Sequence, residues 1–236
     1  MSIALFAGRE MMNARRRKAY ARKYLHAVGS GGAPAIRLLR EFFRRHALAL
    51  ARELLGCVLV HDSPEGRTAG VIVETEAYRG PLDKAAHTYA RRRTPRNEAM
   101  YGPEGHAYVY LIYGIHECFN VVGGEKGAPE AVLVRALEPT QGHSLMARRR
   151  GLDLQTKGAL QKLCSGPGKL TQAMGINRRL HYGIDLCGDQ LFILRGRVYS
   201  DDEVASTPRI NVDYAGAWAK LPWRFVVIDS PYLSVR

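Results

Sequence analysis

The sequence is poor in cysteine and in long apolar runs. No run reaches the roughly eighteen apolar residues that a membrane-spanning helix needs, so no span is expected. The cysteines are far apart and form no CxxC pair, which argues against a zinc ribbon or a disulfide framework. We expect them to be buried thiols in a reducing compartment. They are Cys57, Cys118, Cys164 and Cys187.

Several common signatures are also missing. There is no glycine-rich phosphate loop, no dinucleotide-binding fingerprint and no internal repeat. The N-terminus lacks the apolar stretch of a secretory signal. We therefore expect a protein that is not secreted, located in the cytoplasm or nucleoid of a bacterium, or in the nucleus or an organelle of a eukaryote.

Acidic residues are outnumbered, with 22 Asp and Glu against 35 Lys and Arg, and the formal net charge is +13. A basic surplus favours polyanionic partners, either nucleic acid or an anionic membrane. Nucleic acid is the commoner partner of a chain without a membrane span.

The basic surplus is concentrated at the N-terminus. Nine basic residues stand against one acid, Glu10, within residues 1–40. We interpret residues 1–34 as a basic, disordered arm, with a transit peptide and a misassigned start codon as alternatives. The stretch Ser30–Pro34 resembles a linker, so residues 35–236 are expected to form the folded domain.

Hydrophobic periodicity divides that domain into mixed elements. Helices are expected over 35–55, broken near His46 and ended by Gly56, over 141–151, and over 156–175 with a break at 165–168. Strands are expected at 57–61, 68–78, 107–113, 118–122, 130–137, 191–194, 198–199 and 223–228. This mixture predicts a single α+β domain with a curved, largely antiparallel sheet, a projecting β-hairpin and flanking helices.

The strand 71–78 carries the most informative pattern. Side chains alternate along a strand, so Glu74, Glu76 and Tyr78 share one face. Two acids in an apolar strand are costly to bury and suggest either a general base or a structural ion pair. Periodicity does not choose between the two acids, but Glu76 lies nearer the strand end and is expected to be the more accessible.

A long stretch with little periodicity, 79–106, follows and is typical of a functional segment. His87 lies in it, either as a surface residue or as a group that stacks on a base. The basic cluster in this segment either forms a solvent-exposed surface or binds DNA phosphates. The cluster comprises Arg91, Arg92, Arg93 and Arg96.

Tyrosines dominate the hairpin predicted over 107–122. Tyr110 and Tyr113 are three positions apart, so along a strand they point to opposite faces. One can line a base pocket while the other projects from the hairpin as a wedge. The alternative is an ordinary core strand. Asn120 and Arg135 stand inside apolar strands, where an amide needs a hydrogen-bond partner and a guanidinium needs an anion. Glu76 is one candidate anion for Arg135.

Together these segments resemble the alkyladenine (3-methyladenine) DNA glycosylase family. Order and approximate spacing agree over roughly four fifths of the chain. The matching strings are Leu54–Gly56, Glu74–Tyr78, Ala85–His87, Thr94–Asn97, Tyr108–Tyr110, Ile112–Gly114, Cys118–Asn120, Arg135–Pro139, Cys164–Leu170, Ala215–Trp218 and Ser230–Pro231.

The resemblance implies a role for each matching residue. Glu76 would be the general base and Arg135 would hold that acid and its water. Tyr78, His87 and Tyr110 would form the walls around a flipped base, and Asn120 the pocket floor that disfavours guanine. Tyr113 would enter the minor groove in place of the base. The DNA backbone would meet basic side chains, namely Arg91, Arg92, Arg93, Arg96 and Lys169. Glu117 departs from the family pattern, because an acid stands there near the expected DNA phosphates.

The implied activity is hydrolysis of the N-glycosidic bond of a damaged purine in double-stranded DNA. Candidate lesions are 3-methyladenine, 7-methylguanine, hypoxanthine and ethenoadenine. No lysine stands in the motif as a Schiff-base nucleophile, so we expect a monofunctional enzyme that leaves an abasic site, needs no metal or cofactor, and is a monomer. The alternatives are a non-catalytic nucleic-acid-binding module on the same fold and an enzyme acting on RNA or free nucleosides.

Overall fold

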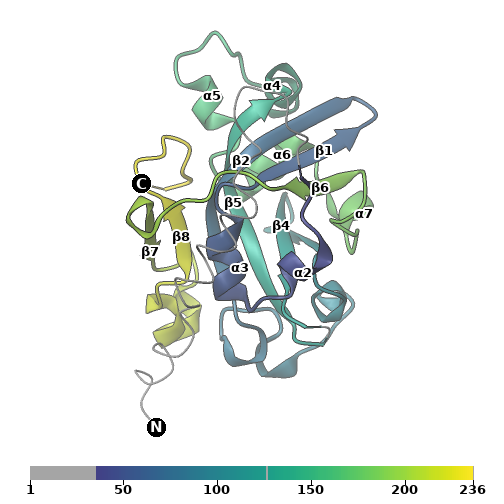
Figure 1. Ribbon diagram of the computed structural model, residues 1–236, viewed down its shortest axis with the longest axis vertical. Helices are drawn as coiled ribbons and strands as arrows, with labels where there is room; N and C mark the ends of the chain where they lie inside the picture. Colours follow the sequence, from purple (N-terminus) through teal and green to yellow (C-terminus); the bar gives the residue numbers. More distant parts are fainter. Residues whose placement is uncertain (1–35, 126, 236) are drawn as a thin grey trace. The chain divides into compact units, whose positions relative to one another are not determined.

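The computed structural model describes residues 36–125 and 127–235, and the N-terminal arm expected at 1–34 lies outside them. Within this range one antiparallel sheet has the strand order β3-β4-β5-β2-β1-β6, with β8 paired to β2 and β7 to β8 (Figure 1). Its strands are β1 Val58–Ser63, β2 Gly66–Tyr78, β3 Ala107–Ile112, β4 His116–Gly123, β5 Glu130–Gln141, β6 Leu191–Leu194, β7 Val204–Thr207 and β8 Arg224–Val227.

Short helices surround the sheet. The α-helices are α2 Arg40–Phe43, α3 Ala47–Leu54, α4 His143–Arg150, α5 Ala159–Lys162, α6 Pro167–Met174 and α7 Arg178–His181. The 3-10 helices are η2 Gly80–Leu82, η3 Tyr89–Arg91, η4 Glu98–Tyr101, η5 Asp201–Glu203 and η6 Asp213–Lys220.

Strand β2 is the centre of the sheet. It pairs with β5 over most of its length, with β1 at its beginning and with β8 at Glu74–Glu76. Its register against β5 shifts around Glu74, as at a β-bulge. Bulges increase local twist and redirect side chains, and they are frequent beside active sites.

Helix α3 covers one face of β2. Its buried residues recur at helical spacing, namely Ala47, Leu50, Ala51 and Leu54. Burying each leucine contributes about 1.5–3 kcal/mol of transfer free energy. The helix is also bonded to the strand, because Thr75 Oγ1 donates to the Ala51 carbonyl at 2.9 Å. This face of β2 is therefore apolar, and the acids occupy its other face.

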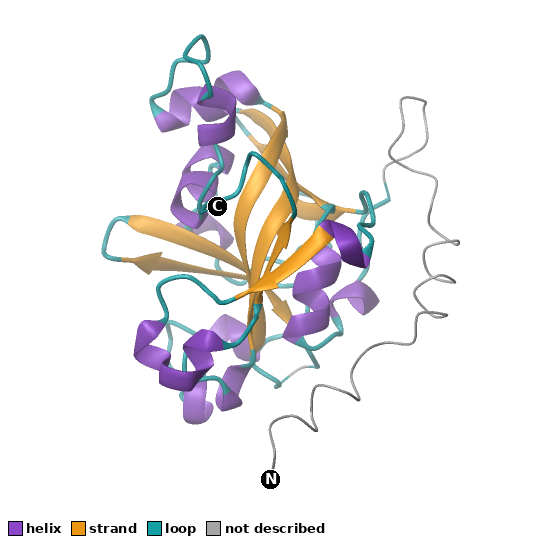
Figure 2. Cartoon of the chain, turned by 90° about the vertical axis from the view of Figure 1, so that its left-hand side faces the viewer, coloured by secondary structure: helices purple, strands orange, loops and turns teal. Residues whose placement is uncertain are grey.

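The β3–β4 hairpin projects from the sheet (Figure 2). Its residues pair from Ala107 with Val121 to Ile112 with His116, which leaves 113–115 as the tip. Both Tyr113 and Gly114 have positive φ, at 54° and 73°. Two consecutive left-handed residues match the tight turns that suit the strand twist.

The fold prediction is confirmed: one mixed α+β domain with an antiparallel sheet, a projecting hairpin and flanking helices. The predicted break near His46 separates α2 from α3, and the predicted break at 165–168 separates α5 from α6. The strand predicted at 198–199 is wrong, because β7 lies at Val204–Thr207 instead. Tyr199 packs against the core without strand pairing.

Gly56 ends α3 with φ +84°, and a Cβ there would lie 2.0 Å from the Arg197 carbonyl oxygen. We predict that Gly56→Ala lowers the free energy of unfolding by more than about 3 kcal/mol, because backbone must shift in addition to the left-handed strain of about 1–2 kcal/mol. Urea denaturation measures this change.

Gly151 is the matched control. Its φ is +62°, but nothing lies within 4 Å of an added Cβ. Gly151→Ala should therefore cost only the conformational strain, about 1–2 kcal/mol. Equal losses in the two variants would contradict the proposed clash at Gly56.

Candidate active site

The two acids of β2 are both fully buried, with no exposed side-chain surface. The expectation that Glu76 is the more accessible of the two is therefore wrong. Strand β8 pairs with β2 along the stretch that carries the acids, and the C-terminal segment contacts Glu74 through Ser234. What distinguishes Glu74 from Glu76 is their partners.

Glu74 is held by two guanidinium groups and by the C-terminal segment. Arg135 Nε and Arg224 Nε each donate to its Oε1 at 2.8 Å. Ser234 adds its hydroxyl at 2.7 Å to Oε1 and its backbone N–H at 2.6 Å to Oε2. Burial alone would raise the pKa of this carboxyl, but Arg135 and the Ser234 donors outweigh it and hold the pKa below its usual range.

Glu76 has fewer and weaker charged partners. Its Oε1 accepts the Ile210 N–H at 2.8 Å and faces Arg135 Nη1 at 3.2 Å. Its Oε2 accepts the Tyr78 hydroxyl at 2.9 Å. Burial and the Glu76 charge raise the pKa of Tyr78 well above its usual value, so this phenol stays protonated and donates.

These partners separate the roles of the acids. Glu74 is neutralised by two arginines and acts as a structural counter-ion. Glu76 contacts only one of those arginines, Arg135, and its other donors are the Ile210 N–H and the Tyr78 hydroxyl. Of the two acids, Glu76 therefore has the weaker compensation of its charge by arginine.

Aromatic side chains lie beside Glu76. His87 Nδ1 and the Tyr108 hydroxyl are 2.7 Å apart, and the ring centroids of His87 and Tyr110 are 4.6 Å apart in an edge-to-face contact. Tyr78 packs against the cluster that contains Tyr108 and Tyr110. The rings of His87 and Tyr110 are in contact, so no base can fit between them. These two side chains would therefore lie on the same side of a base pocket, and Tyr78 could form the opposite side.

His87 is half-buried rather than a surface residue. Burial, and then the charges of Arg96 and Arg92, lower its pKa to about 4, so the ring is neutral at pH 7. Asn120, on the adjacent strand, is buried and donates to the Tyr108 carbonyl at 3.0 Å. The structure thus brings the predicted pocket residues around one cluster.

The hairpin tip is the exposed part of this region. Tyr110 is buried in β3, whereas Tyr113 is 75% exposed in the turn. The two tyrosines differ in burial because Tyr113 lies beyond the strand, where strand parity no longer applies. Glu117, the departure from the family pattern, has its Oε2 buried without a hydrogen-bond partner among the described residues. Its carboxylate therefore turns inward from the tip.

The predicted backbone-binding residues are all exposed, on the surface of the 79–106 segment and on α6. Arg93 pairs with Glu98 at 2.9 Å and Arg96 donates to the Leu111 carbonyl at 3.1 Å. The Arg96 guanidinium lies 5.4 Å from the Tyr110 ring, so it adjoins the aromatic cluster. Lys169 lies in the first turn of α6, where Gly168 faces the His116 side chain of the hairpin.

Three contributors were not predicted from the sequence. Arg224 and Ser234 hold Glu74, and the Ile210 N–H holds Glu76. Nothing in the local pattern identifies an arginine in a short strand or a serine near the C-terminus as buried around an acid. The antiparallel pairing of β8 with β2 places Arg224 there, and the C-terminal segment and the loop after β7 bring Ser234 and Ile210.

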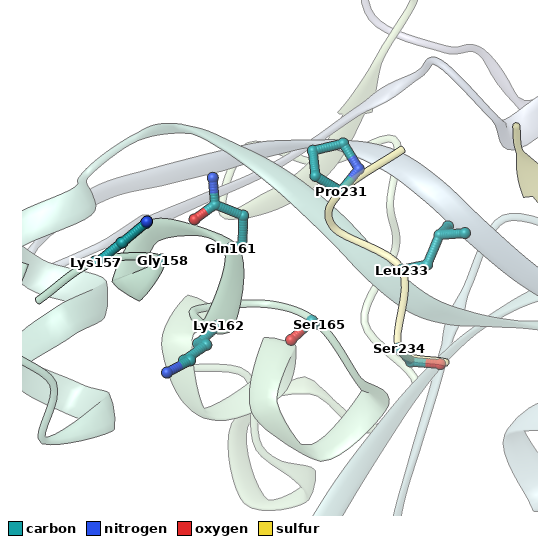
Figure 3. A pocket seen from close by; sticks show the side chains of 8 residues that line it. All are labelled: Lys157, Gly158, Gln161, Lys162, Ser165, Pro231, Leu233 and Ser234. Carbon is teal, nitrogen blue, oxygen red and sulfur yellow. The ribbon is translucent and has the colours of Figure 1, made fainter. Parts of the chain in front are cut away.

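A separate surface pocket is shown in Figure 3, between α5 and the C-terminal segment. No predicted site residue lines it; it meets the buried cluster only through Ser234. We place the site at Glu76, where the chemical groups converge. Within residues 36–125 and 127–235 no group of three or more potential ligands could hold a metal ion, and no helix is long and apolar enough to span a bilayer.

A buried acid beside an aromatic cluster, next to an exposed tyrosine and surface arginines, is the arrangement expected of enzymes that act on a nucleobase within nucleic acid. Residues 41–231 match the family Methylpurine-DNA glycosylase (MPG). A protein of Desulfitobacterium hafniense is 47% identical over 203 residues, covering 85% of this chain and 99% of the relative.

A protein of Clostridium acetobutylicum is 48% identical over 203 residues, covering 85% of this chain and 98% of the relative. One of Bacillus cereus strain G9842 is 45% identical over 202 residues, covering 83% and 98%. All three are named as candidate 3-methyladenine DNA glycosylases. The chain belongs to the methylpurine-DNA glycosylase family.

We predict that Glu74→Gln lowers the free energy of unfolding by about 3–5 kcal/mol at pH 7, because Arg135 and Arg224 lose the carboxylate that neutralises them. The folded-state pKa of Glu74 is depressed, so its contribution is fully present above the unfolded value of 4.5 and is lost as pH falls through the lower folded value. Urea denaturation from pH 7 down to pH 3 measures the difference.

The control is Glu98→Gln, which removes the exposed partner of Arg93. This variant should leave stability almost unchanged at every pH, because exposed ion pairs are strongly screened by solvent. A difference between wild type and Glu74→Gln that does not shrink below pH 4.5 would refute the counter-ion role.

Proposed function

We propose that this chain is a monofunctional glycosylase of base excision repair. It would flip an alkylated or deaminated purine from double-stranded DNA and hydrolyse the N-glycosidic bond with water, leaving an abasic site. The observation that carries the proposal is the pair of Glu76 with Arg135, in which one arginine is shared between a neutralised acid and a less encumbered one.

The proposed chemistry follows from the partners of Glu76. A water molecule donates to the carboxylate and attacks the anomeric carbon while the bond to the base breaks, and its proton passes to Glu76. The negative charge also stabilises the positive charge that develops on the sugar. Arg135 and the Ile210 N–H hold the carboxylate in one orientation. The leaving purine takes the electron pair of the broken bond.

The proposed base pocket has Tyr78 on one side and the His87–Tyr110 pair on the other. Neutral His87 does not repel a purine made cationic by methylation. A cationic base leaves readily, whereas hypoxanthine and ethenoadenine need protonation as they leave. Asn120 lies at the cluster's edge and would form the floor that disfavours guanine.

The hairpin supports a duplex substrate. An enzyme acting on a base must take it out of the stack, and an inserted side chain can hold the vacated step open. Tyr113 is the exposed aromatic at the tip, and basic residues flank the hairpin to contact phosphates. A free nucleoside requires neither feature. A binding-only module requires no buried acid paired with arginine.

We predict that Glu76→Gln lowers the single-turnover rate of base release by roughly 10²–10⁴-fold while lesion-duplex affinity is retained, because the amide cannot accept the proton from water. Release is measured from duplexes carrying hypoxanthine or ethenoadenine and from methylated DNA. Strand breaks should appear only after alkali, and borohydride should trap no covalent complex. Turnover by Glu76→Gln at the wild-type rate would refute the assignment of the base.

We predict that Tyr113→Ala lowers excision from duplex DNA by roughly ten- to a hundredfold and affects single-stranded substrate much less, because only a duplex leaves a gap to fill. Ile115→Ala, at the same tip and 74% exposed, is the control and should have a smaller duplex-specific effect. Equal losses of Tyr113→Ala on duplex and single strand would argue against a wedge.

A further inference from the structure

Arg209 is a fully buried cation outside the catalytic pair. Its guanidinium makes a two-point ion pair with Asp83, with Nη1 at 2.6 Å from Oδ2 and Nη2 at 2.9 Å from Oδ1. It also donates to the carbonyls of Ala77 at 3.0 Å and Trp218 at 3.3 Å. Neither Asp83 nor Arg209 has any exposed side-chain surface.

This pair joins the end of β2 to two loops. Asp83 accepts the backbone N–H groups of Arg79 at 3.1 Å and Ala85 at 2.9 Å, which shapes the segment leading to His87. Arg209 anchors the loop after β7, and its bond to the Ala77 carbonyl fixes that loop beside the strand carrying Glu76. The two loops are thus held by one interaction.

Both loops deliver contacts to the candidate active site. The residue after Arg209, Ile210, donates its N–H to Glu76 Oε1 at 2.8 Å. The Arg209 guanidinium also lies 4.8 Å from the Tyr78 ring centroid, and the Tyr78 hydroxyl donates to Glu76 Oε2. Arg209 therefore supports a donor to each oxygen of the Glu76 carboxylate.

A buried ion pair is a poor device for stability, because desolvation of both charges offsets their attraction. Its advantage is a fixed relative orientation. The planar guanidinium of arginine donates two hydrogen bonds to a carboxylate in one geometry, and the ammonium of lysine cannot reproduce that geometry. Arg209 directly precedes Ile210, so its orientation sets that of the Ile210 peptide. A rotation of this peptide would take the Ile210 N–H away from Glu76.

We infer that the Asp83–Arg209 pair is a positioning element for the reaction: it holds the Ile210 N–H and the Tyr78 hydroxyl on the Glu76 carboxylate. The inference rests on the proposed function of Glu76 and adds two positioning residues to it. Neither side chain contacts the reacting atoms, and both act through Ile210 and Tyr78.

The test uses the full chain with Arg209→Lys and Asp83→Asn. Arg209→Lys keeps the charge but loses the fork, and Asp83→Asn keeps the shape but loses the charge. We expect saturating single-turnover excision to fall by about tenfold or more, as for supporting residues around a reactive group, with lesion-duplex affinity within about twofold of wild type.

The matched control is Arg149→Lys. Arg149 also donates twice to a carboxylate, from Nε and Nη2 to Glu65 Oε2, and it donates to the Ala173 carbonyl, but it links α4 to the β1–β2 turn. This variant should leave the single-turnover rate of excision unchanged. If Arg209→Lys and Arg149→Lys behave alike, the Asp83–Arg209 pair is only structural and the inference is wrong.

A second measurement is independent of catalysis. Hydrogen exchange of the Ile210 amide should accelerate in Arg209→Lys and Asp83→Asn relative to wild type and to Arg149→Lys. Unchanged protection would overturn the inference even in an active enzyme. Wild-type protein that releases no base would refute the proposed function instead, while the exchange result would still decide whether the pair holds Ile210.

Discussion

The buried Glu74–Arg135–Glu76 contact near the end of β2 is the interaction on which the rest of the site depends. Two carboxylates so close together would repel each other if they were left alone in a low-dielectric interior. Arg135 lies against both and makes the arrangement possible. Arg224 then adds a second cation beside Glu74, so Glu74 contacts two guanidinium groups and Glu76 contacts one.

That requirement explains the architecture around β2. Strand β8 must pair with β2 to bring Arg224 to Glu74, and the C-terminal segment must return to bring Ser234. The cluster therefore ties distant parts of the chain to one strand. Burying so many charges costs free energy that an apolar core would not, and the result is a carboxylate held in one orientation.

Function in this family needs a rigid interior and an accessible surface, and the fold separates them. The acids are buried at the sheet centre, while the hairpin tip and the basic segment after β2 face solvent. The aromatic cluster of His87, Tyr108 and Tyr110 lies between these regions and connects to Glu76 through Tyr78. In the proposed reaction, a nucleobase flipped out of the DNA would meet these aromatic rings before it meets Glu76.

Much of this could be read from local sequence, because alternation and turn residues act over a few neighbours. The pattern of β2, the hairpin at Gly114 and the helix stop at Gly56 were predictable for that reason. Partner choice was not: the burial of Arg209, its ion pair with Asp83 and the return of Ser234 depend on strand pairing between residues more than a hundred positions apart.

The sequence by itself determined the α+β class, the elements that carry Glu76, Tyr110 and Tyr113, and the resemblance to one glycosylase family. Only the tertiary structure decided that Glu74 contacts two arginines and Glu76 only one. The physical reason is that alternation orients a side chain locally, whereas the charge around a buried carboxylate is set by arginines from other strands.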